Sequence, residues 1–322
     1  YSDLGHRVRG HAISAFQMSE RIPITLLSGY LGSGKTTIVN HLLRAEKNLR
    51  LAVLVNDFGA VNIDADLIEN SDATSVELTN GCVCCSIGDD LGAALSAQRE
   101  RTPPPDAILL EASGVSEPAR IARLVGHWPG FTLDAIIVAA DGETVRQRAG
   151  DKFVSHLVQS QLRCADIIAL TKTDLISSQA CLRVQAWLRT ASSAPVVIAP
   201  DGAVPPELAF GANSGQRRDG SQPEDSEHPA FATFTWTPSH PVDIARLQAV
   251  LGNLHEDIHR VKGQLVDART GTPVLVQKVG QRCAITHASK AEQFCLVMIS
   301  ADEQMDFKQV AADLDACAVA SR

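Results

Sequence analysis

The segment from Gly29 to Thr36 reads G-x-x-x-x-G-K-T, a spacing that suits a loop wrapped around phosphate groups. The apolar run Ile22 to Leu27 before it predicts a buried strand, and Ile38 to Glu46 after it predicts a helix. Glycines let backbone N–H groups turn toward a polyphosphate, and the helix start adds partial positive charge. Lys35 can reach the β- and γ-phosphates, and the Thr36 hydroxyl can bind Mg²⁺. We therefore expect a nucleoside triphosphate to contact Gly29, Gly32, Ser33, Gly34, Lys35, Thr36 and Thr37.

Three cysteines, Cys82, Cys84 and Cys85, fall within four residues of one another. The adjacent Cys84 and Cys85 cannot easily pack in one core, and thiolates are soft donors that favour Zn²⁺ or Cu(I). The cluster predicts a metal site with three protein thiolates and a fourth position that is open or filled from elsewhere. A closed structural zinc site would show a second ligand pair at regular spacing, which the sequence lacks. A redox pair or buried thiols are the alternative.

Two further apolar runs lead into acidic side chains. Ala107 to Leu110 closes on Glu111, an arrangement in which the acid holds the Mg²⁺ shell of a bound nucleotide. Gly114 leaves room for its N–H to meet a γ-phosphate. Leu51 to Val55 is also a buried run, and Asp57 follows it in a polar loop. Asp57 could orient the attacking water or contact Mg²⁺, and a solvated acidic loop is the alternative.

A tetrapeptide after another predicted strand indicates which base is bound. Ala165 to Leu170 predicts the strand, and Thr171-Lys172-Thr173-Asp174 comes directly after it. This is the guanine-loop pattern N-K-x-D with Thr in place of Asn. Asp174 would accept hydrogen bonds from guanine N1 and N2, and Lys172 would lie along the base, whereas adenine offers no such pair of donors. The pattern favours GTP over ATP, with contacts from Thr171, Lys172 and Asp174.

Strands that alternate with helices predict an α/β fold, a doubly wound and mostly parallel sheet of the P-loop NTPase kind. Further strands are expected at Asp134 to Ala140 and near Val196 to Ala199, and Ser116 is expected to cap a helix. A polar stretch rich in Gly and Ser, residues 211–229, predicts a flexible linker. The expected organisation is a tail at residues 1–20, a P-loop domain at 21–205, a linker at 206–229 and a smaller α+β domain at 230–322.

The segment after the linker mixes strand and helix patterns. Phe231 to Trp236 alternates like a half-buried strand, Val242 to Leu254 has helical spacing, and a terminal helix is expected from Met305 to Ala318. Further strands are expected at Leu265–Val266, Pro273–Gln277, Arg282–Thr286 and Phe294–Ile299. His255-Glu-Asp-Ile-His259 matches the zinc-protease pattern H-E-x-x-H, but a third ligand is not evident downstream. We interpret it as a solvated helix end.

Composition narrows the class of protein. Of the 322 residues, 45% are hydrophobic and 20% charged, with a formal charge of −8 and a pI near 5.7. No general binding to nucleic acid or anionic membranes is expected, and no apolar run approaches the ~18 residues of a membrane span. Without a signal-like segment the expected compartment is the reducing cytoplasm. Met18 is a candidate natural start, and residues 1–17 are left out of the fold. Five scattered cysteines are expected to be small buried hydrophobes: Cys164, Cys181, Cys283, Cys295 and Cys317.

Taken in order, these motifs resemble those of CobW-type GTPases, a family that includes zinc-transfer metallochaperones and cobalamin-pathway proteins. The motifs are the phosphate loop, Asn56-Asp-Phe-Gly59, Asn80-Gly-Cys-Val-Cys-Cys-Ser86, Glu111-Ala-Ser-Gly114, Glu117-Pro118 and Thr171-Lys-Thr-Asp174. Arg260-Val-Lys-Gly263 resembles the signature of the family's C-terminal domain, so the resemblance covers about residues 21–322. The implied fold is a SIMIBI-like GTPase followed by a CobW C-terminal-like domain.

The resemblance implies an enzyme that hydrolyses GTP to GDP and phosphate and uses the reaction to move a metal to a client apo-metalloprotein. The metal would be Zn²⁺, with Co²⁺ or another divalent ion as alternatives. The implied roles are catalysis for Lys35, Asp57 and Glu111, Mg²⁺ binding for Thr36 and Glu111, and Zn²⁺ binding for Cys82, Cys84 and Cys85. A fourth zinc ligand would be water, a client group or a thiol of a second protomer, which leaves a homo-oligomer open.

The chain departs from the family pattern at several positions. Asp57 stands where Glu is common, Val55 and Ala60 replace flanking Glu residues, and the linker carries only His228 where many members have a His-rich tract. Metal loading would then rest on the thiols alone. The alternatives are a metal-sensing or storage regulator with weak GTPase activity, cobalt handling in a cobalamin pathway, and a P-loop kinase. No arginine finger is obvious, so slow basal hydrolysis is expected.

Overall fold

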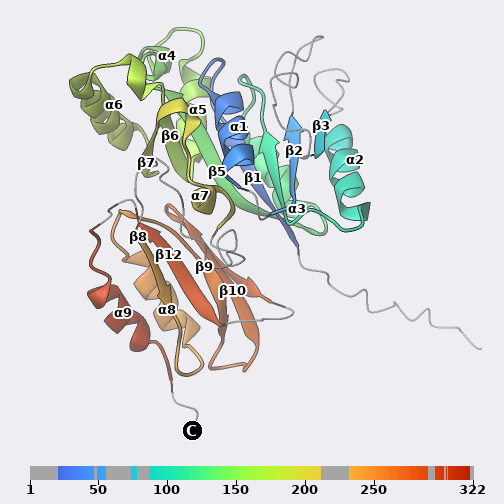
Figure 1. Cartoon of the computed structure of the whole chain (residues 1–322), viewed down its shortest axis with the longest axis vertical. Coiled ribbons are helices and arrows are strands. Elements are labelled where there is room, and N and C mark those ends of the chain that lie inside the picture. The colour runs from blue at the N-terminus through green and yellow to red at the C-terminus, as the bar shows by residue number, and fades with distance from the viewer. Residues whose placement is uncertain are drawn as a thin grey trace, which may run out of the picture.

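The computed structural model describes residues 21–46, 49–55, 74–77, 87–211, 232–288, 294–300, 302 and 304–319. These residues form two units that lie against each other, an α/β unit with a parallel sheet and an α+β unit with an antiparallel sheet (Figure 1). Among the described helices, none combines the length and the apolar character needed to cross a bilayer.

The first sheet has seven strands in the order β3-β2-β4-β1-β5-β6-β7, and every pairing is parallel. The strands are β1 (Ile22–Ser28), β2 (Leu51–Val55), β3 (Thr74–Glu77), β4 (Ala107–Glu111), β5 (Phe131–Asp141), β6 (Ile167–Thr171) and β7 (Val196–Ala199). The doubly wound parallel sheet is thus confirmed. The sequence patterns missed β3, a strand of four residues at the edge of the sheet.

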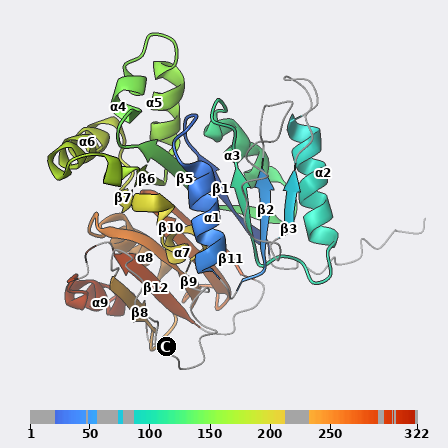
Figure 2. The ribbon, with the colours of Figure 1, turned by 45° about the horizontal axis from the view of Figure 1, so that its top comes forward.

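Helices cover both faces of this sheet, because successive residues of a strand point in opposite directions. Leu26 and Leu27 are both fully buried, yet they belong to different apolar clusters. The cluster around Leu26 is covered by α2 (Ile87–Glu100), α3 (Pro118–His127), α5 (Ser155–Cys164) and α6 (Ser178–Ala191). The cluster around Leu27 is covered by α1 (Lys35–Ala45) and α7 (Pro206–Phe210) (Figure 2). Burial on both faces explains why these strands read as continuous apolar runs.

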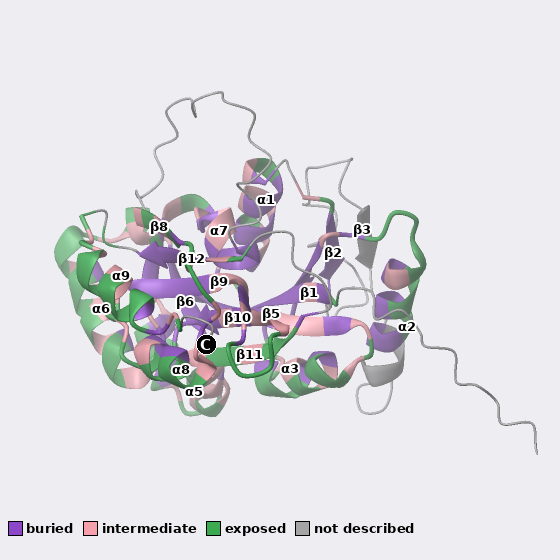
Figure 3. Cartoon of the chain, turned by 90° about the horizontal axis from the view of Figure 1, so that it is seen from below, coloured by how far each residue is buried: buried purple, intermediate pink, exposed green. Residues whose placement is uncertain are grey.

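The second sheet has five antiparallel strands in the order β11-β10-β9-β12-β8. They are β8 (Ala232–Trp236), β9 (Ile258–Val266), β10 (Pro273–Val279), β11 (Arg282–His287) and β12 (Cys295–Ser300). Helices α8 (Ile244–Gly252) and α9 (Lys308–Asp315) share one apolar cluster with this sheet. In Figure 3 the strands β1 and β2 are coloured mostly as buried, whereas α6 and α9 carry mainly exposed and partly exposed residues. The predicted α+β architecture is confirmed.

The H-E-x-x-H segment is not helical. Helix α8 ends at Gly252, His255 lies in the following turn, and His259 belongs to β9. His259 is 4% exposed, so the expectation of a solvated helix end is wrong for this residue. The sequence pattern predicts a strand only at Leu265–Val266, whereas β9 begins at Ile258.

Helix α7 connects the first unit to the second. The start of the expected linker, residues 206–210, is this helix, and Leu208, Ala209 and Phe210 are buried. The Thr25 hydroxyl donates a 2.6 Å hydrogen bond to the Ala209 carbonyl, which fastens α7 to β1. Residues 212–229 of the expected linker lie outside the described residues.

Buried charges join the two units near the amino ends of β5 and β6. Asp134 and Arg260 are each about 1% exposed, and the Arg260 guanidinium lies 2.5 Å from the Asp134 carboxylate. Gln277 donates to the other oxygen of this carboxylate at 2.9 Å, and Lys262 lies 3.5 Å from it. Burial acts to raise the pKa of Asp134, but Arg260 and Lys262 outweigh it and hold that pKa below its ordinary value. Asp134 is therefore ionised and paired.

A second ion pair lies beside the first. The Arg282 guanidinium lies 2.7 Å from the Asp166 carboxylate and donates to the carbonyl oxygens of Leu133 and Asp134. Together these contacts fix the C-terminal sheet at the amino end of the parallel strands, and the opposite edge, with the phosphate loop, faces away from it (Figure 1).

His259 makes stability depend on pH. Burial lowers its pKa from 6.5 to about 4, with Asp257 opposing and Lys278 adding to the shift. Between pH 6.5 and pH 4 the unfolded chain binds the proton of this histidine more strongly than the folded chain does. The free energy of unfolding therefore falls as the pH drops, by roughly 2–3 kcal/mol near pH 4.5. In His259→Gln this part of the pH dependence should disappear, as measured by urea unfolding near pH 7 and near pH 4.5.

His156→Gln serves as the control for this substitution, because His156 is exposed on α5. The control should keep the wild-type pH dependence. If His259→Gln loses as much stability on acidification as the wild type does, the buried neutral histidine is not its source.

Candidate functional site

The phosphate loop leaves β1 at Gly29 and enters α1 at Lys35. Gly29 has a φ of 138°, and a Cβ there would lie 2.4 Å from the Ala139 carbonyl oxygen. Gly34 has a φ of 86° and precedes the first helical residue, so the first-turn N–H groups of α1 open onto the loop. The geometry suits an anion, because the loop amides and the positive end of the helix dipole meet here.

Thr36 and Glu111 come together beside this loop. In the sheet β4 pairs with β1, and Glu111 lies in register with Leu27, just before the loop begins. The Glu111 carboxylate is 3% exposed, and its Oε1 lies 3.5 Å from the Thr36 hydroxyl. A hydroxyl and a carboxylate are hard oxygen donors of the kind that Mg²⁺ prefers in nucleotide sites, so these two residues fit the ion.

The loop after β4 packs against the phosphate loop. A Cβ on Gly114 would lie 2.7 Å from the backbone nitrogen of Leu31 and 2.7 Å from its Cδ2 atom. Gln161 of α5, 1% exposed, donates to the carbonyl oxygens of Gly114 at 3.1 Å and of Ser116 at 3.2 Å. Gln161 thus fixes the backbone whose N–H would face a γ-phosphate.

Ser116 does not cap a helix. Helix α3 begins at Pro118 with Glu117 in the capping position, and the Ser116 hydroxyl donates back to the Ser113 carbonyl at 2.7 Å. Proline fits the first helical position because its missing N–H needs no partner there, so the helix begins one residue later than a Ser116 cap would place it.

The guanine loop is tied to the phosphate loop. The Thr171 hydroxyl lies 2.8 Å from the Ser33 carbonyl oxygen and 3.2 Å from that of Ala140. Lys172 adopts a left-handed φ of 55°, and its Nζ donates to the Asp141 carboxylate at 2.8 Å. Asp174 lies in the short 3₁₀ turn Thr173–Leu175 and is exposed. Thr171 therefore joins the two loops, while the contacts of Lys172 and Asp174 with a base stay a prediction.

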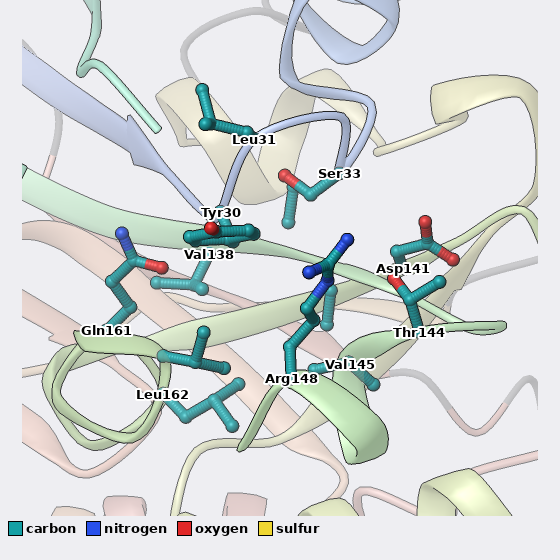
Figure 4. A pocket seen from close by; sticks show the side chains of 13 residues that line it. Tyr30, Leu31, Ser33, Val138, Asp141, Thr144, Val145, Arg148, Gln161 and Leu162 are labelled. Atoms are coloured by element: carbon teal, nitrogen blue, oxygen red, sulfur yellow. The ribbon is translucent and has the colours of Figure 1, made fainter. Parts of the chain in front are cut away.

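A small pocket lies between the phosphate loop and the carboxyl end of β5 (Figure 4). Arg148 of α4 (Val145–Ala149) extends into it, and its guanidinium carbon lies 5.5 Å from the centroid of the Tyr30 ring, a cation–π contact. Figure 4 shows the Arg148 guanidinium between Tyr30 and Asp141, with Ser33 above. The sequence motifs do not include three residues of this pocket: Arg148, Asp141 and Gln161. Asp141 could have been found, because it is an acid at the end of an apolar strand, as Glu111 is.

Asp57, Cys82, Cys84 and Cys85 lie outside the described residues. The ends of the flanking elements are described. β2 ends at Val55, which pairs with both Glu77 at the end of β3 and Glu111 at the end of β4. The chain thus enters both undescribed segments, residues 56–73 and 78–86, from the edge of the sheet that carries the phosphate loop.

The five scattered cysteines are free thiols. Cys181 and Cys317 are buried, as expected, and Cys164 and Cys295 are partly exposed. Cys283 is exposed on β11, so the expectation of a buried residue is wrong there. Within the described part of the chain, no group of three or more His, Cys, Asp or Glu side chains is arranged to hold a metal ion.

The close packing of Gly114 gives a test of the site. We expect Gly114→Ala to weaken nucleoside triphosphate binding about tenfold or more, because the added methyl group must displace Leu31, and overpacking costs about 1–3 kcal/mol. The control is Gly126→Ala in α3, where an added Cβ meets nothing within 4 Å. The control should bind normally and melt at a slightly higher temperature. Unchanged affinity in Gly114→Ala, measured by calorimetry, would contradict this account of the two loops.

Two family models match the chain. The model described as CobW/HypB/UreG, nucleotide-binding domain, matches residues 23–198, and the cobalamin synthesis protein cobW C-terminal domain matches residues 231–318. A zinc chaperone CobW from Sinorhizobium sp is 28% identical over 308 residues, which cover 81% of this chain and 86% of that protein. The zinc chaperone YjiA of Escherichia coli (strain K12) is 29% identical over 266 residues, which cover 76% of this chain and 81% of that protein.

The crystal structure of the Zn(II)-bound YjiA GTPase from E. coli aligns over 93% of this chain and 99% of its own, with 21% identity and a TM-score of 0.46. The first family model alone covers more than half of the chain, and the second covers the C-terminal unit. By these matches the chain is a CobW-type member of the CobW/HypB/UreG family of P-loop nucleotide-binding proteins, with a CobW C-terminal domain.

Proposed function

We propose that this protein is a GTP-hydrolysing metallochaperone that binds Zn²⁺ at Cys82, Cys84 and Cys85 and transfers it to a client apo-metalloprotein. The observation that supports it most is the joining of the phosphate loop, the Thr36–Glu111 pair and the guanine loop at one edge of the sheet. Membership of the CobW family and the zinc chaperones among its relatives support the choice of metal cargo.

In this proposal the phosphate loop binds the substrate GTP. Lys35 and the amino end of α1 hold the β- and γ-phosphates, and the Gly114 N–H approaches the γ-phosphate. Mg²⁺, held by Thr36 and Glu111, neutralises charge on the phosphates when it is bound. Asp57, on the segment after β2, orients the attacking water.

The order of the strands supports a coupling between nucleotide binding and metal binding. The segment with the three thiols follows β3, and the segment with Asp57 follows β2. Glu111 ends β4, and β3, β2 and β4 are neighbouring strands, so the predicted metal and nucleotide residues follow or end adjacent strands. A γ-phosphate that interacts with Asp57 would act on the segment that follows β2, the strand next to β3. Nucleotide state and metal affinity would then be coupled, and the coupling must be reciprocal.

We propose the domain organisation stated above, with the linker shortened by α7, and a reducing compartment that keeps the thiols reduced. The fourth zinc ligand comes from water, the client or a second protomer. An open fourth position favours transfer, because an incoming ligand can bind before the others leave.

The guanine contact is tested by Asp174→Asn. We expect GTP affinity to fall about tenfold or more while ATP affinity changes little, because the variant leaves the guanine N1 and N2 donors without a carboxylate acceptor. Lys35→Ala should abolish binding of both nucleotides. Calorimetry with each nucleotide is the measurement, and wild-type protein that binds ATP as tightly as GTP would rule out the guanine loop.

The metal claim is tested by titrating Zn²⁺ against a chromogenic chelator, once with GDP and once with a non-hydrolysable GTP analogue. Zinc affinity should differ between the two states and fall at low pH, because protons compete for the thiolates. The variant with Cys82, Cys84 and Cys85 all changed to Ser should lose the site and still bind GTP. A matched control changes the partly exposed or exposed thiols Cys164, Cys283 and Cys295 to Ser, and should keep it.

Equal zinc affinity with both nucleotides would leave a storage or sensing protein rather than a chaperone driven by GTP. Full zinc affinity in the variant that lacks Cys82, Cys84 and Cys85 would remove the proposed metal site altogether.

A further inference from the structure

We propose that Asp141 is a positioning residue that sets guanine specificity by holding Lys172 against the base. The inference rests on the proposed binding of GTP and assigns a role to a side chain outside the family motifs named above. Asp141 ends β5, the strand next to β1 on the side away from Glu111.

The Asp141 carboxylate uses its two oxygens for two different purposes. Oδ1 accepts a 2.8 Å hydrogen bond from the backbone N–H of Glu143, which fixes the carboxylate within its own turn. Oδ2 accepts the 2.8 Å hydrogen bond from the Lys172 Nζ. An acceptor anchored in this way can orient a long flexible side chain, because its own rotamer is already fixed.

The Asp141 side chain is about 10% exposed and that of Lys172 about 35%. Burial acts to raise the pKa of Asp141, but the hydrogen bonds from Lys172 and from the Glu143 backbone outweigh it, so that this pKa lies below its ordinary value. The carboxylate is thus charged at neutral pH, and the pair is an ion pair as well as a hydrogen bond.

The backbone of the same turn supports the guanine loop. The Gly142 N–H donates to the Thr171 carbonyl at 3.0 Å, and a Cβ on Gly142 would lie 3.1 Å from that oxygen and 3.1 Å from the Ile176 Cδ1 atom. The turn therefore touches the guanine loop on both sides of Lys172. Lys172 itself has a left-handed φ, a conformation that a side chain-bearing residue adopts at a cost and that neighbouring contacts must maintain.

These contacts explain how Lys172 can lie along a flat base. A free lysine side chain has many rotamers and would lose about 2 kcal/mol of conformational entropy on becoming ordered. Asp141 fixes the amino group before the nucleotide arrives, so the methylene stem is already in place to cover the ring. Asp141 need not touch the nucleotide, because it acts through Lys172.

The test compares Asp141→Asn, Lys172→Met and the double variant by their affinities for GTP, GDP and ATP. We expect Asp141→Asn to weaken GTP and GDP equally, by about fivefold, because the lost contact is to the base and not to the γ-phosphate. ATP affinity should change less, because adenine lacks the two donors that Asp174 would accept from and so is not held against Lys172. Lys172→Met should have an equal or larger effect, and the double variant should be no worse than Lys172→Met alone.

The matched control is Glu143→Gln on the same turn, where the side chain is exposed. It should keep wild-type affinity for all three nucleotides. A purely structural role for Asp141 would lower the melting temperature without changing the ratio of GTP to ATP affinity, so both are measured.

The outcomes separate this inference from the proposed function. If the wild type prefers GTP and Asp141→Asn keeps the full preference, or if the two substitutions are additive, the positioning role is wrong while the guanine loop stands. If the wild type does not prefer GTP, both are wrong.

Discussion

The buried ion pair between Asp134 and Arg260 fixes how the two units are arranged. Each side chain is about 1% exposed, and removing one partner of such a pair costs about 3–5 kcal/mol because the other charge is left inside without compensation. The pair is further held by the Arg260 hydrogen bond to the Leu208 carbonyl in α7. Docking at the amino ends of β5 and β6 is therefore strongly favoured over a loosely tethered C-terminal unit, and the carboxyl edge is left for ligands.

Strand β5 runs from the end of the sheet that contacts the C-terminal unit to the end that carries the phosphate loop. Asp134 lies near its amino end and Asp141 ends it, a separation of about 23 Å along an extended strand. The same strand thus contacts the C-terminal unit at one end and Lys172 of the guanine loop at the other. A displacement of the C-terminal unit would therefore act on β5, the strand that also carries the carboxylate paired with Lys172.

Strands and helices could be predicted where a short stretch of sequence carries the pattern, and not where a distant partner stabilises the element. The apolar runs of β1, β2, β4, β5 and β6 are local, and they were identified to within a few residues. Strand β9 was mostly missed, because Arg260 and Lys262 make it look polar; their burial is explained only by Asp134, which is 126 and 128 residues away in the chain. Helix α7 was assigned to a linker for the same reason, since its partner Thr25 lies 184 residues before Ala209.

The residues of the site differ in the same way: some belong to contiguous motifs, and others act on partners that are distant in the chain. The phosphate loop, Glu111 and the guanine loop are contiguous motifs, and Glu111 and Thr171 lie where their motifs suggested. Gln161 and Asp141 act on backbone or side chains 47 and 31 residues distant, so no motif contains both partners. Yet Asp141 and Glu111 obey one rule: each is an acid that ends a buried parallel strand, and those strands, β5 and β4, flank β1. The phosphate loop therefore lies between two carboxylates, that of Glu111 beside Thr36 and that of Asp141 paired with Lys172, and the order of the strands places them on opposite sides of the loop.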